Sequence, residues 1–127
     1  MPAKILIVDD SSTTLLMEEM LLKKYTNFEV VQARNGQEAV EKALIEQPNL
    51  ILMDVIMPKM DGFTACREMR KRQELRETPI ILVTSRGEPQ NVEMGFESGC
   101  NDYLTKPIES QELLQMVKGY LGAENAR

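Results

Sequence analysis

The chain has 127 residues, and its 43% hydrophobic and 28% charged residues are ordinary for a globular protein; we expect a single domain over residues 1–127, with a core from about residue 3 to residue 121. The formal charge of −5 and the scattered Lys and Arg residues argue against direct nucleic-acid binding, which needs a basic face. No apolar run approaches the roughly 18 residues that span a bilayer, and the N-terminal residues lack a signal-peptide pattern, so we expect no membrane contact and a cytoplasmic location.

Five segments are predicted to be strands. Runs of four apolar residues lie at positions 5–8, 50–53 and 80–83. Continuous apolarity of this kind is typical of a strand that is covered on both faces, as in a parallel sheet between helices. Two weaker candidates lie at positions 28–31 and 102–104.

Apolar residues with helical spacing lie between these strands and after the last one. Asn35, with Glu38 three residues later, predicts a capping box at the start of the second helix, and Glu109 or Ser110 is the expected cap of the last helix. The residues that mark the first, second and last helices are Leu15, Leu16, Met20, Leu21, Ala39, Val40, Ala43, Leu44, Leu113, Leu114, Met116, Val117 and Tyr120.

The two remaining helices differ in strength. A helix is expected over residues 63–73, after an Asp-Gly turn and cap at positions 61–62. The segment 90–98 is the weakest helix, because Pro89 precedes it and Gly95 lies inside it, where a glycine costs roughly 1 kcal/mol relative to alanine. We expect this helix to be the most easily displaced.

Strict alternation of strand and helix predicts an α/β fold, a (βα)₅ doubly wound open sheet of five parallel strands. We interpret Met17, Met20, Met57 and Met60 as residues that fill the core or its edge.

Cysteine and histidine contribute no predicted chemistry. Cys66 and Cys100 lack metal-ligand spacing, and we expect two buried or half-buried thiols. The chain contains no histidine, which excludes His-based acid–base catalysis and His-containing zinc sites.

Polar residues follow four of the predicted strands. Asp9 and Asp10 follow the first, Asp54 follows the third, Thr84 and Ser85 follow the fourth, and Thr105-Lys106-Pro107 follows the fifth. In open α/β sheets, ligands bind outside the carboxyl ends of the strands. We therefore expect these side chains to meet in one crevice.

Three neighbouring carboxylates need a cation to stay ionised together. A small set of oxygen ligands with room for water and phosphate suits Mg²⁺ better than zinc or calcium. Lys106 adds a positive charge and Thr84 adds a hydroxyl, as phosphoryl transfer requires. Asp54 is then a candidate nucleophile that forms an aspartyl phosphate.

Four separated motifs resemble the receiver domains of two-component response regulators, which are CheY-like proteins. They are Val8-Asp9-Asp10, the run from Met53-Asp54 to Asp61-Gly62, Val83-Thr84-Ser85, and Tyr103 through Lys106-Pro107. The similarity covers essentially the whole chain. It implies a flavodoxin-like sheet with strand order 2-1-3-4-5 and a signalling domain that is not an enzyme beyond its own phosphoryl transfer and dephosphorylation.

The resemblance also implies a role for each residue. Asp54 is the phosphoacceptor, and the metal ligands are Asp10 directly, Asp9 through water, Asp54 and the backbone carbonyl of Ile56. Lys106 pairs with the acidic cluster and then with the phosphoryl group. The phosphate-binding residues implied are Ile56, Ser85 and Lys106, the switch residues are Thr84 and Tyr103, and Pro107 follows a cis peptide bond.

Partners follow from the same resemblance. We expect a sensor histidine kinase or a phosphotransfer protein as phosphodonor. A downstream effector is expected to bind the face formed by the fourth helix, the fifth strand around Tyr103 and the fifth helix, and a phosphorylation-dependent dimer is compatible with the sequence. Ile56 is apolar and cannot orient a hydrolytic water. Arg86, two residues after Thr84, could shield the phosphoryl group or pair with Glu88. We therefore expect a long-lived phosphate.

Three rival classes fit less well. A haloacid-dehalogenase-type phosphatase needs a second Asp where Ile56 stands, and a nucleotide-binding domain needs a glycine-rich loop after the first strand. A pseudo-receiver that acts only as an interaction module usually lacks an acidic residue, the acceptor or the lysine, and this chain has all of them.

Overall fold

Five parallel strands form a single sheet in the order β2-β1-β3-β4-β5. The computed structural model describes residues 2–85 and 90–122, with only the backbone of Ser85 and of residues 90–92. This topology confirms the predicted doubly wound α/β fold and its strand order. The strands are β1 Lys4–Val8, β2 Glu29–Ala33, β3 Leu50–Asp54, β4 Ile80–Ser85 and β5 Asp102–Lys106.

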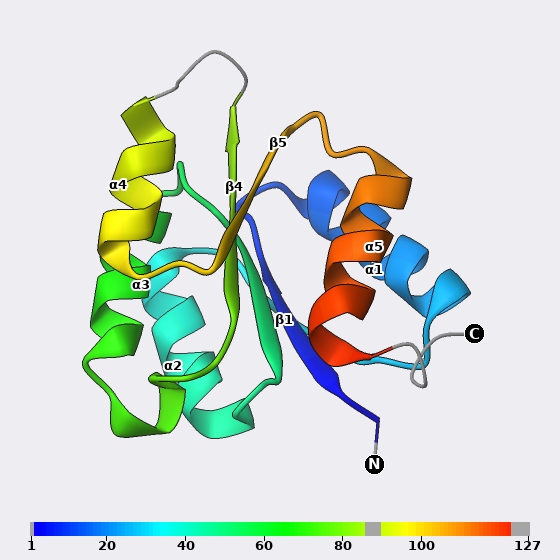
Figure 1. Cartoon of the computed structure of the whole chain (residues 1–127), viewed down its shortest axis with the longest axis horizontal. Helices are drawn as coiled ribbons and strands as arrows, with labels where there is room; N and C mark the ends of the chain where they lie inside the picture. The colour runs from blue at the N-terminus through cyan, green and yellow to red at the C-terminus, as the bar shows by residue number, and fades with distance from the viewer. Residues whose placement is uncertain (1, 86–89, 123–127) are drawn as a thin grey trace.

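Helices cover both faces of the sheet, as Figure 1 shows. On one face lie α1, Ser12–Tyr25, and α5, Ser110–Leu121. The opposite face carries α2, Gly36–Glu46, α3, Gly62–Arg70, and α4, Gln90–Ser98, together with a short 3₁₀ turn, Gln73–Leu75. Within the described ranges, none of the helices has the length and apolar character that a membrane crossing requires.

The alternating side chains of the strands divide the core into two apolar layers. In β1, Leu6 and Val8 pack on the side of α2 and α3, whereas Ile5 and Ile7 pack on the side of α1 and α5. All four are buried, and this explains why β1 reads as a continuous apolar run. Cys66 and Cys100 are buried free thiols, as expected.

The predicted boundaries of three elements need correction. The second strand, predicted at positions 28–31, spans Glu29–Ala33. The third helix ends at Arg70, not at residue 73, and a 3₁₀ turn follows at Gln73–Leu75. The Arg70 side chain bonds the carbonyl oxygens of Leu75 at 2.7 Å and Gly99 at 2.9 Å, which holds the chain in this turn. Strand β5 continues to Lys106, because Lys106 is in register with Ser85 of β4.

Side-chain caps begin the helices near the predicted positions. The Asn35 side chain accepts a hydrogen bond from the backbone N–H of Glu38 at 2.9 Å, as the capping box predicts. The Glu38 carboxylate accepts from the N–H of Arg34, one residue before the cap. Glu109, and not Ser110, caps α5.

The prediction for Met17 and Met20 was wrong. Their exposed fractions are 64% and 62%, whereas Met57 is buried and Met60 packs against the core as expected. Helix α1 instead turns Leu15, Leu22 and the acidic residue Glu18 inward.

Candidate functional site

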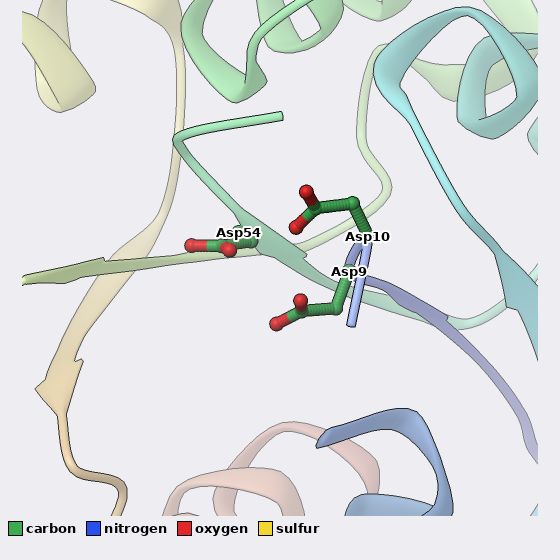
Figure 2. A group of neighbouring side chains, drawn as sticks. All are labelled: Asp9, Asp10 and Asp54. Carbon is green, nitrogen blue, oxygen red and sulfur yellow. The ribbon is translucent and has the colours of Figure 1, made fainter. Parts of the chain in front are cut away.

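The carboxylates of Asp9, Asp10 and Asp54 meet at the carboxyl ends of β1 and β3 (Figure 2). One oxygen from each lies within 4.8 Å of the others. The sheet register causes this meeting, because Val8 is paired with Met53 and the next residues of both strands emerge side by side. Asp9 and Asp54 are buried, whereas Asp10 is exposed. A donor set of carboxylate oxygens, open to solvent on one side, suits a hard divalent cation such as Mg²⁺.

The Lys106 ammonium bridges the two buried carboxylates from the end of β5. Its Nζ lies 3.0 Å from Asp54 Oδ2 and 3.2 Å from Asp9 Oδ2. The other oxygen of each carboxylate is also bonded: Asp54 Oδ1 accepts from the N–H of Val55 at 2.9 Å, and Asp9 Oδ1 accepts from the N–H of Ser11 at 2.9 Å. These contacts fix the orientation of both acids before any ligand binds.

Burial and like charge control the electrostatics of this cluster. Burial raises the pKa of Asp54, and the nearby Asp9 adds to the rise, while the hydrogen bond from Lys106 opposes it. Burial disfavours the charged form of Lys106, but the hydrogen bonds and attraction from Asp54 and Asp9 outweigh it and raise the pKa of Lys106. The lysine therefore stays protonated, and the carboxylates still lack the positive charge that would balance them.

Gly62, the first residue of α3, allows the start of this helix to lie against the backbone of Asp54. A Cβ atom at Gly62 would collide with the backbone oxygen of Asp54 and lie 3.0 Å from the Cα of Val55. The N–H of Gly62 donates to the carbonyl of Val55 at 2.8 Å. Asp61 caps α3 by accepting from the N–H of Thr64, so the Asp-Gly pair is a turn and cap, as predicted.

The other predicted residues lie around this cluster to different degrees. Thr84 is buried on β4, directly after Val83, which is paired with Asp54. Ile56 follows β3 with a side chain that is 60% exposed. The backbone of Ser85 pairs with Lys106, but the Ser85 side chain and Arg86 lie outside the described residues.

Tyr103 lies on β5 and faces α4. Its ring stacks on Phe96 with centroids 6.5 Å apart. Gly95 explains this approach, since a Cβ there would lie 3.2 Å from the Tyr103 ring. The glycine that weakens α4 therefore has a packing function. The Lys106-Pro107 peptide bond is cis, as the resemblance implied.

Sequence reasoning missed Glu18, a buried acid behind the cluster. It is 7% exposed, and its Oε1 atom has no hydrogen-bond partner within the described part of the chain. Burial, followed by the charge of Asp9, raises the pKa of Glu18 to about 8. The signal was its spacing: Glu18 stands on the same helical face as Leu15 and Leu22, where an apolar residue is expected.

Comparisons with known proteins agree with the geometry. The family model for the response regulator receiver domain matches residues 5–118. The chain is 40% identical over 118 residues to the transcriptional regulatory protein ResD of Bacillus subtilis, covering 93% of this chain and 48% of ResD. It thus spans about half the length of the curated relatives that it matches.

Solved structures show the same fold. The chemotaxis response regulator CheY4 of Vibrio cholerae superposes with a TM-score of 0.88 at 32% identity, covering 95% of this chain and 100% of CheY4. The receiver domain of a sensor histidine kinase from Pseudomonas aeruginosa has a TM-score of 0.87 at 31% identity, covering 97% of this chain and 100% of that domain. That structure has a magnesium ion coordinated in its active-site cleft.

Proposed function

The chain belongs to the response regulator receiver domain family, whose members act in phosphorylation-based two-component signalling, and on that premise we propose that Asp54 is its phosphoacceptor. The observation that carries the proposal is the arrangement of Asp54, Asp9 and Lys106, which join into one hydrogen-bonded group at the strand ends. A histidine kinase or a phosphotransfer protein would supply the phosphoryl group.

The transfer begins with attack by a carboxylate oxygen of Asp54 on the phosphorus of a phosphohistidine. The new O–P bond forms as the P–N bond breaks, and the imidazole leaves with the bonding electron pair and is protonated. Lys106 lies 3.0 Å from Asp54 Oδ2, so its ammonium is positioned to bond the phosphoryl oxygens as they arrive. The domain would act only on its own phosphoryl group, in both transfer and hydrolysis, and not on a separate substrate.

Asp9, Asp10 and Asp54, with the backbone carbonyl of Ile56, would hold a Mg²⁺ ion. When bound, this ion would neutralise negative charge on the carboxylates and the phosphoryl oxygens. The residues fit such an ion, because three carboxylates converge and one of them, Asp10, is exposed to the solvent from which an ion and its waters arrive. The role of Lys106 is complementary, since it already neutralises one charge of the buried pair.

Phosphorylation would change the surface near α4. The added group carries roughly −1.5 to −2 charges and three acceptor oxygens, which favours movement of the Thr84 hydroxyl and Lys106 toward it. Ser85 and the Ile56 backbone would complete the phosphate contacts. A shift of Thr84 would open space for the Tyr103 ring, which packs on Phe96 of α4. We assign α4, β5 and α5 as the face that binds an effector or a second phosphorylated copy.

Three further properties belong to this proposal. Residues 1–127 would form one receiver domain with its core at about 3–121, acting in the cytoplasm. The phosphate would be long-lived, because the exposed Ile56 side chain has no group to orient a hydrolytic water. Arg86, which is predicted to shield the phosphoryl group or to pair with Glu88, lies outside the described residues.

Incubation with acetyl phosphate and Mg²⁺, followed by intact mass spectrometry, tests the proposal. We expect one added phosphate, lost when EDTA is present and in Asp54→Asn. Asp61→Asn is the matched control, because Asp61 is a nearby exposed acid that caps α3 and Asn can cap in its place. Phosphate on Asp54→Asn, or its loss in the control, would contradict the assignment.

A further inference from the structure

A groove lies between α1 and α5, on the face of the sheet opposite to α4. It has a volume of about 820 Å³, within the roughly 300–1,000 Å³ range of small-molecule sites. Apolar side chains form most of its wall, among them Met17, Met20, Ile108 and Leu113. Met17 and Met20 are 64% and 62% exposed. The groove therefore offers an apolar surface that remains in contact with solvent.

One buried polar side chain lines this apolar groove. Glu18 is 7% exposed, yet its Oε1 atom has no hydrogen-bond partner among the described residues. A buried acceptor without a partner costs roughly 1–3 kcal/mol, so a ligand that supplies a donor recovers that cost. This combination of apolar wall and unsatisfied acceptor is typical of a ligand site, in which a few polar groups fix orientation.

The charges around the groove favour a positive ligand head. Asp9 and Asp54 act on Glu18 with the same sign of charge, and Lys106 is the nearby cation that opposes them. Lys106 is already bonded to both aspartates. The other lysine of the groove, Lys24, is exposed and lies over the Tyr25 ring, 5.4 Å from its centroid. Glu18 therefore lines the groove beside two lysines, but Asp9 and Asp54 of the neighbouring cluster hold Lys106, so its charge is not available to Glu18.

We propose that the groove between α1 and α5 binds a small molecule with an apolar body and one ammonium or amidinium head, and that the Glu18 carboxyl receives the head. The body lies along Met17, Met20, Ile108 and Leu113. Binding ionises Glu18, whose proton leaves to solvent, and the new ion pair is shielded by the apolar wall. The groove shares Lys106 with the aspartate cluster, but the proposal does not rest on phosphorylation of Asp54, and the binding experiments below do not test that phosphorylation.

Three probes of matched size test the proposal: 4-phenylbutylamine, 4-phenylbutan-1-ol and 4-phenylbutyrate. Each is titrated into the ¹⁵N-labelled full chain while amide chemical shifts are recorded. We expect shifts confined to α1, α5 and the residues 106–110 between β5 and α5. At pH 8, near the pKa of Glu18, little free energy is needed to ionise this carboxyl, and the amine should bind about tenfold or more tightly than the alcohol, since hydrogen bonds to charged groups contribute roughly 1.5–3 kcal/mol. The carboxylate should bind most weakly.

Two variants locate the interaction. Glu18→Gln keeps the shape of the side chain and should lose most of the preference for the amine while still binding the alcohol. Glu41→Gln, the same change at an exposed position of α2, should retain the wild-type order. Equal binding of the three probes, no binding up to their solubility, shifts mapped elsewhere, or an amine preference that survives in Glu18→Gln would each overturn the proposal.

Discussion

Replacing Glu18 by Gln is expected to stabilise the folded chain at neutral pH. Burial, followed by the charge of Asp9, raises the pKa of Glu18 from 4.5 to about 8. In the unfolded chain this carboxyl has its ordinary pKa, so between about pH 4.5 and pH 8 the folded state binds more protons than the unfolded state. The free energy of unfolding therefore falls as the pH rises through this window, and the loss levels off above pH 8.

The size of the effect follows from the two pKa values. At pH 7 the solution is about 2.5 units above the ordinary pKa and still below the folded value. Each unit corresponds to about 1.36 kcal/mol, so keeping Glu18 protonated costs about 3 kcal/mol at pH 7 and almost nothing at pH 4.5. Gln has nearly the same shape and no charge to lose. The variant should therefore gain about 3 kcal/mol at pH 7 and little at acidic pH.

Urea denaturation followed by circular dichroism at pH 5, 6, 7 and 8 measures this difference. The other acids titrate in both proteins, so the difference between wild type and Glu18→Gln isolates the one carboxyl. Glu41→Gln, an exposed residue, should follow the wild type at every pH. A constant difference between Glu18→Gln and wild type over this range would refute the buried, protonated state of Glu18.

Three further changes give separable outcomes. Gly62→Ala should lower the melting temperature and slow phosphorylation by acetyl phosphate, because the new Cβ atom would collide with the backbone of Asp54. Gly119→Ala is the control: its Cβ atom would meet nothing within 4 Å, and the variant should be about 1 kcal/mol more stable in thermal denaturation. Mg²⁺ at one hundred times its dissociation constant should stabilise the wild-type chain by about 2.7 kcal/mol, measured by thermal shift. Asp54→Asn should be stabilised much less. Equal shifts in the two proteins would argue against Asp54 as a metal ligand. Ile56→Asn should shorten the lifetime of the phosphate measured by intact mass; a lifetime of seconds in wild type, unchanged in the variant, would contradict the proposed role of the apolar side chain.

Strand positions were predictable because burial on both faces leaves a simple trace in the sequence. Ile5 and Ile7 serve one layer of the core and Leu6 and Val8 the other, so all four must be apolar. The convergence of Asp9 and Asp54 was also predictable, since parallel strands end at one edge of the sheet. The pairing of Val8 with Met53 in neighbouring strands then places Asp9 next to Asp54, without any contribution from side-chain packing.

Helix α1 was less predictable because its apolar residues occupy more than one face. Leu15 and Leu22 point inward, but Leu16, Met17 and Met20 are exposed. Apolarity alone does not distinguish these positions, and an inward acid such as Glu18 contradicts the pattern. The end of α3 was missed for a different reason, since long-range bonds from Arg70 to the carbonyls of Leu75 and Gly99 determine where the chain turns.

The charges at the strand ends connect the stability prediction to the proposed chemistry. When Asp9, Asp10 and Asp54 are ionised, three carboxylates and the single ammonium of Lys106 leave a net charge of −2, which one divalent cation balances. An ionised Glu18 would add a fourth negative charge that such an ion leaves uncompensated. The burial that keeps Glu18 protonated near neutral pH thus preserves the match between the cluster and a divalent cation, at a cost in folding free energy that the apolar strands around it offset.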